Sequence, residues 1–183
     1  MKHLLLLLLA LCSMRCQMRE ESKARVSATT QSAAGYDLTP LGESEVEELA
    51  KSLTPDERKV ILYQGTEAPF CGNLLANKKH GTYVCRLCGL PLFESKSKFE
   101  SGTGWPSFYE PVDQAHVARI EDRAHGMLRT EIRCARCNGH LGHVFDDGPP
   151  PTGERHCLNS ASLEFVEQGQ PLPRKTAADK ASK

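Results

Sequence analysis

The chain has 183 residues, of which 39% are hydrophobic, and its 23 basic side chains balance 23 acidic ones. This length predicts one domain with flanking ends and a core of modest size. The balanced charge provides no basic surface for nucleic acid or for anionic lipid, so we expect neither partner. The unusual feature is the eight cysteines, because a small core often needs a metal or disulfides to stabilise it.

Residues 1–16 have the character of an export signal. The run Leu4–Leu11 follows a weakly positive start and is too short to span a bilayer. Small residues at Ala10 and Cys12 precede a possible cleavage site. We therefore expect an exported protein, in the bacterial periplasm or cell envelope or otherwise in a secretory pathway. Two alternatives stay open: an uncleaved apolar N-terminus, and a lipid anchor on Cys12 or Cys16, although neither follows the small residue expected there.

Two helices are expected after a flexible polar linker over residues 17–42. The apolar spacing within residues 43–53 fits a short helix. Thr54 and Glu57 have the capping-box spacing of a second helix start. We expect this second helix to end before Gly65.

Short β-branched or aromatic segments bounded by Gly, Pro and Asp follow, and we interpret them as strands. They are Thr82–Val84, Leu90–Phe93, Val117–Ile120, Met127–Ile132, Leu141–Phe145 and Ser162–Val166. The prediction is a mainly β domain of the α+β class over residues 43–168, antiparallel, with its helices on the N-terminal side. The polar, Lys-rich tail over residues 169–183 is expected to be disordered.

Four cysteines form two matched Cys-x-x-Cys pairs. Cys85 and Cys88 precede a glycine, and Cys134 and Cys137 precede Asn-Gly, so a tight turn can follow each pair. Four thiolates make a closed tetrahedral set, which is typical of a structural zinc site with one ion per chain. Because the pairs are far apart in the sequence, the β domain must bring them together. The alternative is a pair of disulfides, which an exported protein can form.

Cys157 stands outside both pairs. A lone cysteine is more often a small buried hydrophobe than a nucleophile, but the neighbours of Cys157 favour reactivity. Arg155 can stabilise the thiolate, which is the reactive form. If this stretch is a strand, Arg155, Cys157 and Asn159 share one face.

A second polar motif lies upstream, in Gly139–Gly148. His140 and His143 would face opposite sides of a regular strand, but Gly142 allows a bulge that brings both to one side. The alternative is that each is an ordinary hydrogen-bonded histidine. Trp105, the only tryptophan, lies on a loop constrained by glycines and a proline. It is either core filler or an apolar wall for a sulfur atom and its methyl group.

Three motifs and the two cysteine pairs together resemble the methionine-R-sulfoxide reductases, the B-type peptide methionine sulfoxide reductases. The motifs are Ser101–Phe108, Gly139–Pro149 and Pro151–Leu163, and the resemblance runs from about Glu43 to Glu167. It implies a fold of two antiparallel sheets with zinc at one end. It also implies reduction of the R epimer of methionine sulfoxide, protein-bound or free, in the repair of oxidised proteins.

The resemblance implies that Cys157 is the nucleophile that attacks the sulfoxide sulfur. The positions implied around the sulfoxide oxygen and the substrate side chain are His140, His143, Asn159, Trp105 and Phe145. A histidine can supply the proton that the sulfoxide oxygen needs. Attack gives methionine and a sulfenic acid. A second thiol condenses with this acid to a disulfide, which thioredoxin or an exported thioredoxin-like reductant reduces.

Two positions depart from the family pattern. His156 stands where an aromatic residue usually precedes the nucleophile, so we expect a more polar pocket edge. Thr103 stands where many members carry the resolving cysteine. The remaining candidates are Cys71, Cys12 and Cys16, and we expect Cys71, because some members place a resolving cysteine N-terminal to the first pair. The alternative is that an external thiol reduces the sulfenic acid directly.

Two other classes of protein stay open beside a monomeric reductase that acts on oxidised proteins. A zinc-ribbon-like binding module accounts for the four paired cysteines but not for Cys157 with its polar neighbours. An exported interaction protein with a disulfide framework needs no metal at all. Metal analysis and a sulfoxide reduction assay distinguish the three.

Overall fold

The computed structural model describes residues 31–173, with only the backbone at His125. The expected export signal over residues 1–16, the linker up to residue 30 and the tail from residue 174 lie outside the described residues. The last part of the expected linker, residues 31–42, packs against the domain. Leu38 is buried in the core, the amide of Leu41 donates to the carbonyl of Arg136 at 2.8 Å, and Tyr36 meets the His116 ring edge-on.

Two short helices follow, α2 over Glu43–Ala50 and α3 over Pro55–Tyr63. The capping box of α3 is confirmed. The Glu57 amide donates to Thr54 Oγ1 at 3.2 Å, and the Thr54 amide donates to Glu57 Oε2 at 2.8 Å. In residues 31–173 no helix is long and apolar enough to cross a membrane.

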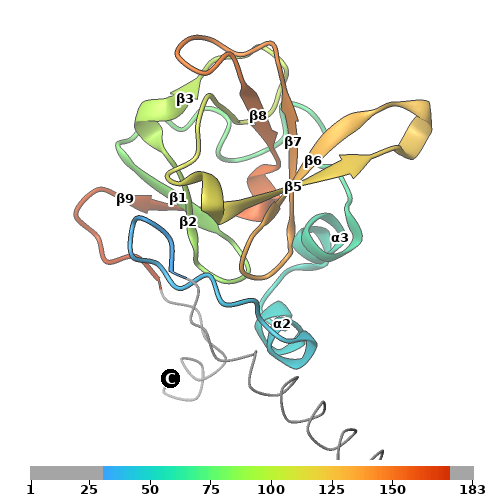
Figure 1. Ribbon diagram of the computed structural model, residues 1–183, viewed down its shortest axis with the longest axis vertical. Coiled ribbons are helices and arrows are strands. Elements are labelled where there is room, and N and C mark those ends of the chain that lie inside the picture. The colour runs from blue at the N-terminus through green and yellow to red at the C-terminus, as the bar shows by residue number, and fades with distance from the viewer. Residues whose placement is uncertain (1–30, 174–183) are drawn as a thin grey trace, which may run out of the picture. The chain divides into compact units, whose positions relative to one another are not determined.

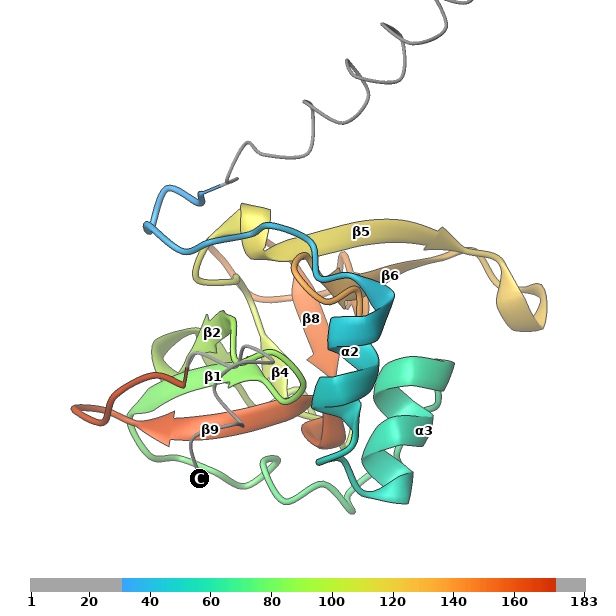
Figure 2. The same ribbon diagram turned by 90° about the horizontal axis from the view of Figure 1, so that it is seen from below.

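The strands form two antiparallel sheets, as expected. A three-stranded sheet has the order β2-β1-β9 and a six-stranded sheet the order β3-β4-β8-β7-β6-β5. Figures 1 and 2 show the first sheet beside β4 and β8, and the far end of the β5–β6 hairpin, at the edge of the second sheet, projecting beyond the rest of the domain. The strands of the first sheet are β1 (Gly81–Cys85), β2 (Pro91–Glu94) and β9 (Leu163–Glu167). Those of the second are β3 (Lys98–Phe99), β4 (Ser107–Phe108), β5 (Val117–Asp122), β6 (Arg129–Cys134), β7 (His140–Phe145) and β8 (Arg155–Leu158). Short 3-10 helices span Ser95–Ser97 (η1), Gln114–His116 (η2), Ala124–Gly126 (η3) and Ser160–Ser162 (η4).

The inner face of the six-stranded sheet packs on the three-stranded one. Phe108 of β4 lies 4.9 Å from Tyr83 of β1 and 4.8 Å from Phe93 of β2, measured between ring centroids. His156 of β8 meets Phe93 at 5.4 Å. These side chains are fully buried, so the core lies between the sheets and β8 is fixed from its inner side.

The outer face of the six-stranded sheet carries a polar row. In this row Ser107 lies opposite Cys157, Cys157 opposite His143, and His143 opposite Glu131. Directly opposed residues of neighbouring strands point to the same face. Cys157 therefore faces away from the aromatic core, on the same side as the histidine motif.

Candidate active site and metal centre

The two Cys-x-x-Cys pairs lie on turns that close the ends of two strands. β1 ends at Cys85, where the Gly89 amide donates to the Cys85 carbonyl at 2.8 Å. β6 ends at Cys134, and the Asn138 amide donates to the Cys134 carbonyl at 2.9 Å. Gly89 and Asn138 both have positive φ, of 73° and 57°, a conformation that Gly and Asn adopt most readily.

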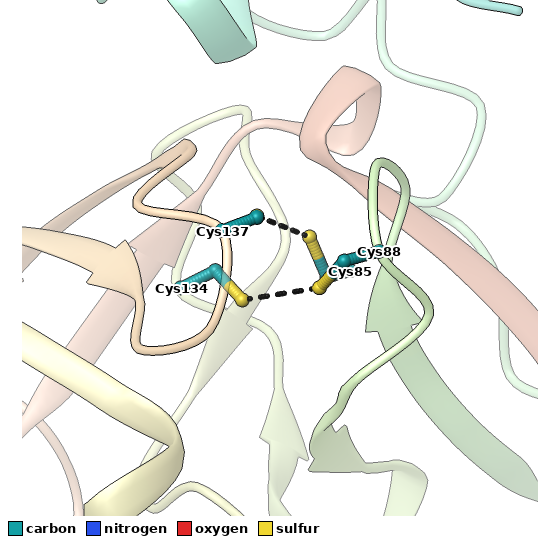
Figure 3. A group of neighbouring side chains, drawn as sticks. All are labelled: Cys85, Cys88, Cys134 and Cys137. Atoms are coloured by element: carbon teal, nitrogen blue, oxygen red, sulfur yellow. Dashed lines mark hydrogen bonds between the residues drawn. The ribbon is translucent and has the colours of Figure 1, made fainter. Parts of the chain in front are cut away.

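The four sulfurs converge in a buried cluster (Figure 3). Sγ of Cys85 lies 3.5 Å from that of Cys137, and Cys88 is at the same distance from Cys134. All four lie within 4.8 Å of one another. Tetrahedral zinc, with Zn–S bonds of about 2.3 Å, places its sulfurs about 3.8 Å apart. The cluster therefore fits a metal ion. The two pairs, which are far apart in the sequence, are brought together by the turns that follow β1 and β6.

Cys157 is half-buried on β8, with hydroxyl groups around its sulfur. Sγ lies 3.9 Å from the hydroxyl of Thr103. Thr103 is the residue that stands where the resemblance would place a resolving cysteine. Across the sheet from it is Ser107, whose hydroxyl pairs with Ser101 at 2.7 Å. Burial raises the pKa of the Cys157 thiol, and Thr103 and Arg155 only partly oppose this. The free thiol is thus the resting form, and the expected stabilisation of the thiolate by Arg155 is outweighed.

The two histidines share the outer face because of a bulge in β7. Across from β6, Ile132 pairs with Gly142 and the next residue, Arg133, pairs with His140, so Leu141 is the extra residue. The two imidazole rings lie 5.7 Å apart between centroids. A Cβ on Gly142 would lie 2.0 Å from the Cys157 carbonyl oxygen, so glycine is needed where β7 approaches β8.

A carboxylate stands behind each histidine. Glu131 Oε1 lies 2.6 Å from His140 Nδ1, and Asp122 Oδ2 lies 2.9 Å from His143 Nε2. Burial lowers the pKa of His140, although Glu131 opposes the shift. A bond from the Ala124 amide, followed by those from His143 and Arg129, holds the pKa of Asp122 well below its usual range. Each ring therefore has one nitrogen engaged by a carboxylate, which leaves the other nitrogen as the one that could meet a ligand.

Arg155 and Phe145 lie next to this group. The two residues are cross-strand partners on β8 and β7, and the guanidinium stands 4.5 Å above the centre of the Phe145 ring. Arg155 also binds both carboxylate oxygens of Asp147, at 2.8 and 3.0 Å. A cation between a carboxylate and an aromatic face is held in one place. The Phe145 ring lies 6.4 Å from that of His143, so it forms an apolar part of the same face.

Asn159 and Trp105 are held from behind by the loop after α3. Asn159 is buried just beyond the end of β8; its Nδ2 donates to the Leu141 carbonyl at 3.1 Å, and its Oδ1 accepts from the Glu67 amide at 3.1 Å. The indole N–H of Trp105 donates to the Glu67 carbonyl at 3.1 Å. From the sequence, Asn159 was expected to share the strand face with Cys157 if the stretch were a strand. In the structure β8 ends at Leu158, and Asn159 lies just beyond it with its side-chain amide hydrogen-bonded within the protein.

Cys71 is exposed and belongs to the same loop. Four residues beyond Glu67, it lies in a surface groove that Gly72, Ser160 and Ala161 also line. The preceding residue, Phe70, donates its amide to the Gly104 carbonyl at 2.8 Å. The loop is thus anchored one residue from Thr103 at one end and beside Ser160 at the other, without a bond between Cys71 and Cys157.

Four residues of this site were missed by the sequence analysis: Glu67, Ser107, Asp122 and Glu131. Asp122 and Glu131 reach the histidines only through the pairing of β5, β6 and β7. Ser107 lies on a two-residue strand, which is too short to show a period. Glu67 contacts residues more than ninety positions away, which no local pattern indicates.

Known proteins match this chain over most of its length. A family model described as the SelR domain matches residues 53–167. The chain belongs to this family, that of the methionine-R-sulfoxide reductases. A Caulobacter vibrioides (strain NA1000 / CB15N) protein named peptide methionine sulfoxide reductase MsrB is 60% identical over 146 residues, covering 80% of this chain and 92% of that protein.

Two further relatives bear the same name. The Xylella fastidiosa (strain M23) protein is 60% identical over 138 residues, which cover 75% of this chain and 89% of that protein. The Escherichia coli (strain K12 / DH10B) protein is 56% identical over 121 residues, which cover 66% and 88%. The family match includes both cysteine pairs, the histidine motif and Cys157, so the outer sheet face described above belongs to the family domain.

Proposed function

We propose that this methionine sulfoxide reductase acts on the R epimer of methionine sulfoxide in oxidised proteins, with Cys157 as its nucleophile. The observation that carries the proposal is the cross-strand pair of Cys157 and His143, with Asp122 behind the histidine. It provides a sulfur nucleophile and a proton donor on one sheet face, which sulfoxide reduction requires. Free methionine sulfoxide presents the same reacting group and is a second substrate.

The first half-reaction transfers one oxygen atom. Cys157 sulfur attacks the sulfoxide sulfur while His143 or His140 protonates the sulfoxide oxygen. The oxygen then moves to Cys157, which leaves a sulfenic acid and the thioether of methionine. Cysteine loses the two electrons that methionine sulfoxide gains, and the balance is thiol plus sulfoxide to sulfenic acid plus thioether.

The surrounding side chains suit the substrate. Trp105 and Phe145 offer apolar surface for the methyl group and side chain of methionine. Because burial raises the pKa of Cys157, a base must take its proton as substrate binds, and a neighbouring imidazole is suited to do so. In this proposal Arg155 lowers the free energy needed to form the Cys157 thiolate. Asn159 positions the Leu141 carbonyl beside the histidines. One chiral pocket accepts one arrangement around sulfur, so the S epimer is excluded.

The second half-reaction joins Cys71 to Cys157. The Cys71 thiol attacks the sulfenic sulfur, water leaves, and a disulfide forms, which thioredoxin or an exported thioredoxin-like dithiol reduces. Exposure of Cys71 and the seating of its loop beside Thr103 and Ser160 support this assignment. A disulfide needs Cβ atoms about 4 Å apart, so Cys71 either lies that close to Cys157 already or is brought there by a movement of its loop.

Zinc is the metal we propose for Cys85, Cys88, Cys134 and Cys137. Four buried sulfurs match its preference for a closed thiolate set, which has no open position for water. When bound, zinc would join the turn after β1 to the turn after β6 and contribute to folding. We also propose export of the chain, on the basis of the leucine run near its start.

The test uses the zinc-loaded protein and a peptide with each sulfoxide epimer. The parent should reduce the peptide with the R epimer only, and Cys157→Ser should reduce neither while it retains zinc and the parental melting temperature. Cys71→Ser is the matched control: it should reduce one equivalent of the peptide and then stop with thioredoxin as reductant. Turnover by Cys157→Ser would refute the nucleophile, and full recycling by Cys71→Ser would refute the resolving residue.

A further inference from the structure

Glu67 connects three separate pieces of the molecule. Its carboxylate accepts from the amides of Ser160 and Ala161, at 2.6 and 3.0 Å. Its own amide donates to Asn159 and its carbonyl accepts from Trp105, each at 3.1 Å. Within residues 31–173 no other residue forms hydrogen bonds to both Asn159 and Trp105, so the positions of these two side chains depend on where the Glu67 backbone lies.

The carboxylate is what fixes that backbone. It caps the start of η4, where the amides of Ser160 and Ala161 come too early in the helix to have a partner within it. Hydrogen bonds from backbone amides to a carboxylate are charge-assisted and stronger than neutral ones. η4 begins directly after Asn159, three residues beyond Cys157. Side chain and backbone of Glu67 therefore hold the loop against the strand that carries the nucleophile.

We propose that Glu67 is a positioning residue for substrate binding: its carboxylate holds the peptide groups that orient the Trp105 indole and the Asn159 amide. The inference rests on the proposed function, in which Trp105 contacts the methionine side chain. Glu67 itself touches none of the reacting atoms. Its loss should allow the indole to turn away from the substrate and so weaken binding, while Cys157, His140 and His143 keep their places in the sheet.

A structural role alone would give a different result. General destabilisation lowers the amount of folded enzyme and leaves its KM unchanged. Loss of indole positioning raises KM and leaves the rate of the first turnover at saturating substrate close to the parental value. Trp105 is the only tryptophan, so the fluorescence of the whole chain reports this one side chain and needs no engineered probe.

The experiment compares Glu67→Gln and Glu67→Ala with the parent. Gln keeps one acceptor oxygen and turns an NH2 group toward the second amide, so it should keep one of the two hydrogen bonds that the carboxylate accepts and lose the other. KM for an R-sulfoxide peptide, measured from the dependence of the peptide reduction rate on peptide concentration, should rise about tenfold in Glu67→Ala and less in Glu67→Gln, because one charged hydrogen bond corresponds to roughly a factor of ten or more. Tryptophan emission should shift to longer wavelength and become more accessible to acrylamide.

Glu164→Gln is the matched control, because Glu164 lines the same groove but binds Arg86 at 3.2 Å. It should retain parental emission and KM. If Glu67→Ala does not fold, as judged by zinc content and melting, the KM and the tryptophan emission of Glu67→Gln test the inference on their own. Parental KM and emission in the Glu67 variants of an active enzyme overturn the inference, as does a loss of first-turnover rate without change in KM. An inactive parent would instead refute the proposed function.

Discussion

Replacement of Gly142 by alanine should separate β7 from β8 at the active site. A Cβ on Gly142 would lie 2.0 Å from the carbonyl oxygen of Cys157 and 3.0 Å from its carbonyl carbon, whereas ordinary contact begins at 3.4 Å. The two strands must therefore move apart by about 1.4 Å at this point, enough to break a backbone hydrogen bond on each side. Two lost bonds at about 1 kcal/mol each and overpacking of about 1 kcal/mol or more give a loss of about 3 kcal/mol.

Urea and thermal unfolding of the zinc-loaded protein would measure this loss. A decrease of about 3 kcal/mol corresponds to a melting temperature lower by about 6–12 °C for a chain of this size. Gly153→Ala is the control for backbone strain without a clash, because Gly153 has φ of +73° and open space around its Cβ; it should cost about 1–2 kcal/mol and leave kcat/KM unchanged. A loss in Gly142→Ala no larger than in Gly153→Ala would refute the reasoning.

Three further predictions concern the metal, the carboxylates and pH. Cys85→Ser should lose zinc and melt well below the parent, whereas Cys71→Ser, outside the cluster, should retain the metal; equal zinc content in both, by elemental analysis, would contradict the site. Asp122→Asn should lower kcat/KM at least about tenfold by misplacing the proton donor, while Glu121→Gln, on the opposite sheet face, should not; equal rates would exclude this role. Burial lowers the pKa of His156 in the folded protein below its value in the unfolded chain. As the pH falls, the unfolded chain therefore takes up the proton before the folded one, so the contribution of His156 to stability is complete above about pH 6.5 and is lost below it. His156→Phe should flatten that fall in denaturant titrations at pH 7.5 and 5.5, and an unchanged slope would assign it to other groups.

The sequence was sufficient for features that depend on neighbouring residues. The capping box of α3 and the two cysteine turns each need only a few consecutive residues, and the structure has them where they were expected. The class of fold was also predictable, because strand segments such as β1, β2 and β9 are bounded by clear turn residues. By contrast, α2 ends at Ala50 rather than at residue 53, a difference within the usual uncertainty of helix ends.

The strand that carries Cys157 was not predictable in the same way. β8 reads Arg-His-Cys-Leu, and its polar residues are buried on both faces: Arg155 outward over Phe145, and His156 inward against Phe93. Alternation of apolar and polar residues, the usual signal of a strand, is therefore absent. β3 and β4 have two residues each and are defined by their pairing, β3 with β4 and β4 with β8. Long-range pairing, which a single sequence does not reveal, determines these elements.

The four-cysteine cluster and the candidate active site are connected by a single turn. Cys134 ends β6 and β7 begins at His140, so the segment that holds Cys134 and Cys137 is also the connection between these two strands. The Cys134 amide donates to the Gly139 carbonyl at 2.9 Å, next to His140. Fixing this turn fixes the register in which Arg133 lies opposite His140 and Glu131 opposite His143. A metal in the cluster would thus stabilise the bulge that brings the two histidines to one face, because it would hold the turn from which β7 begins.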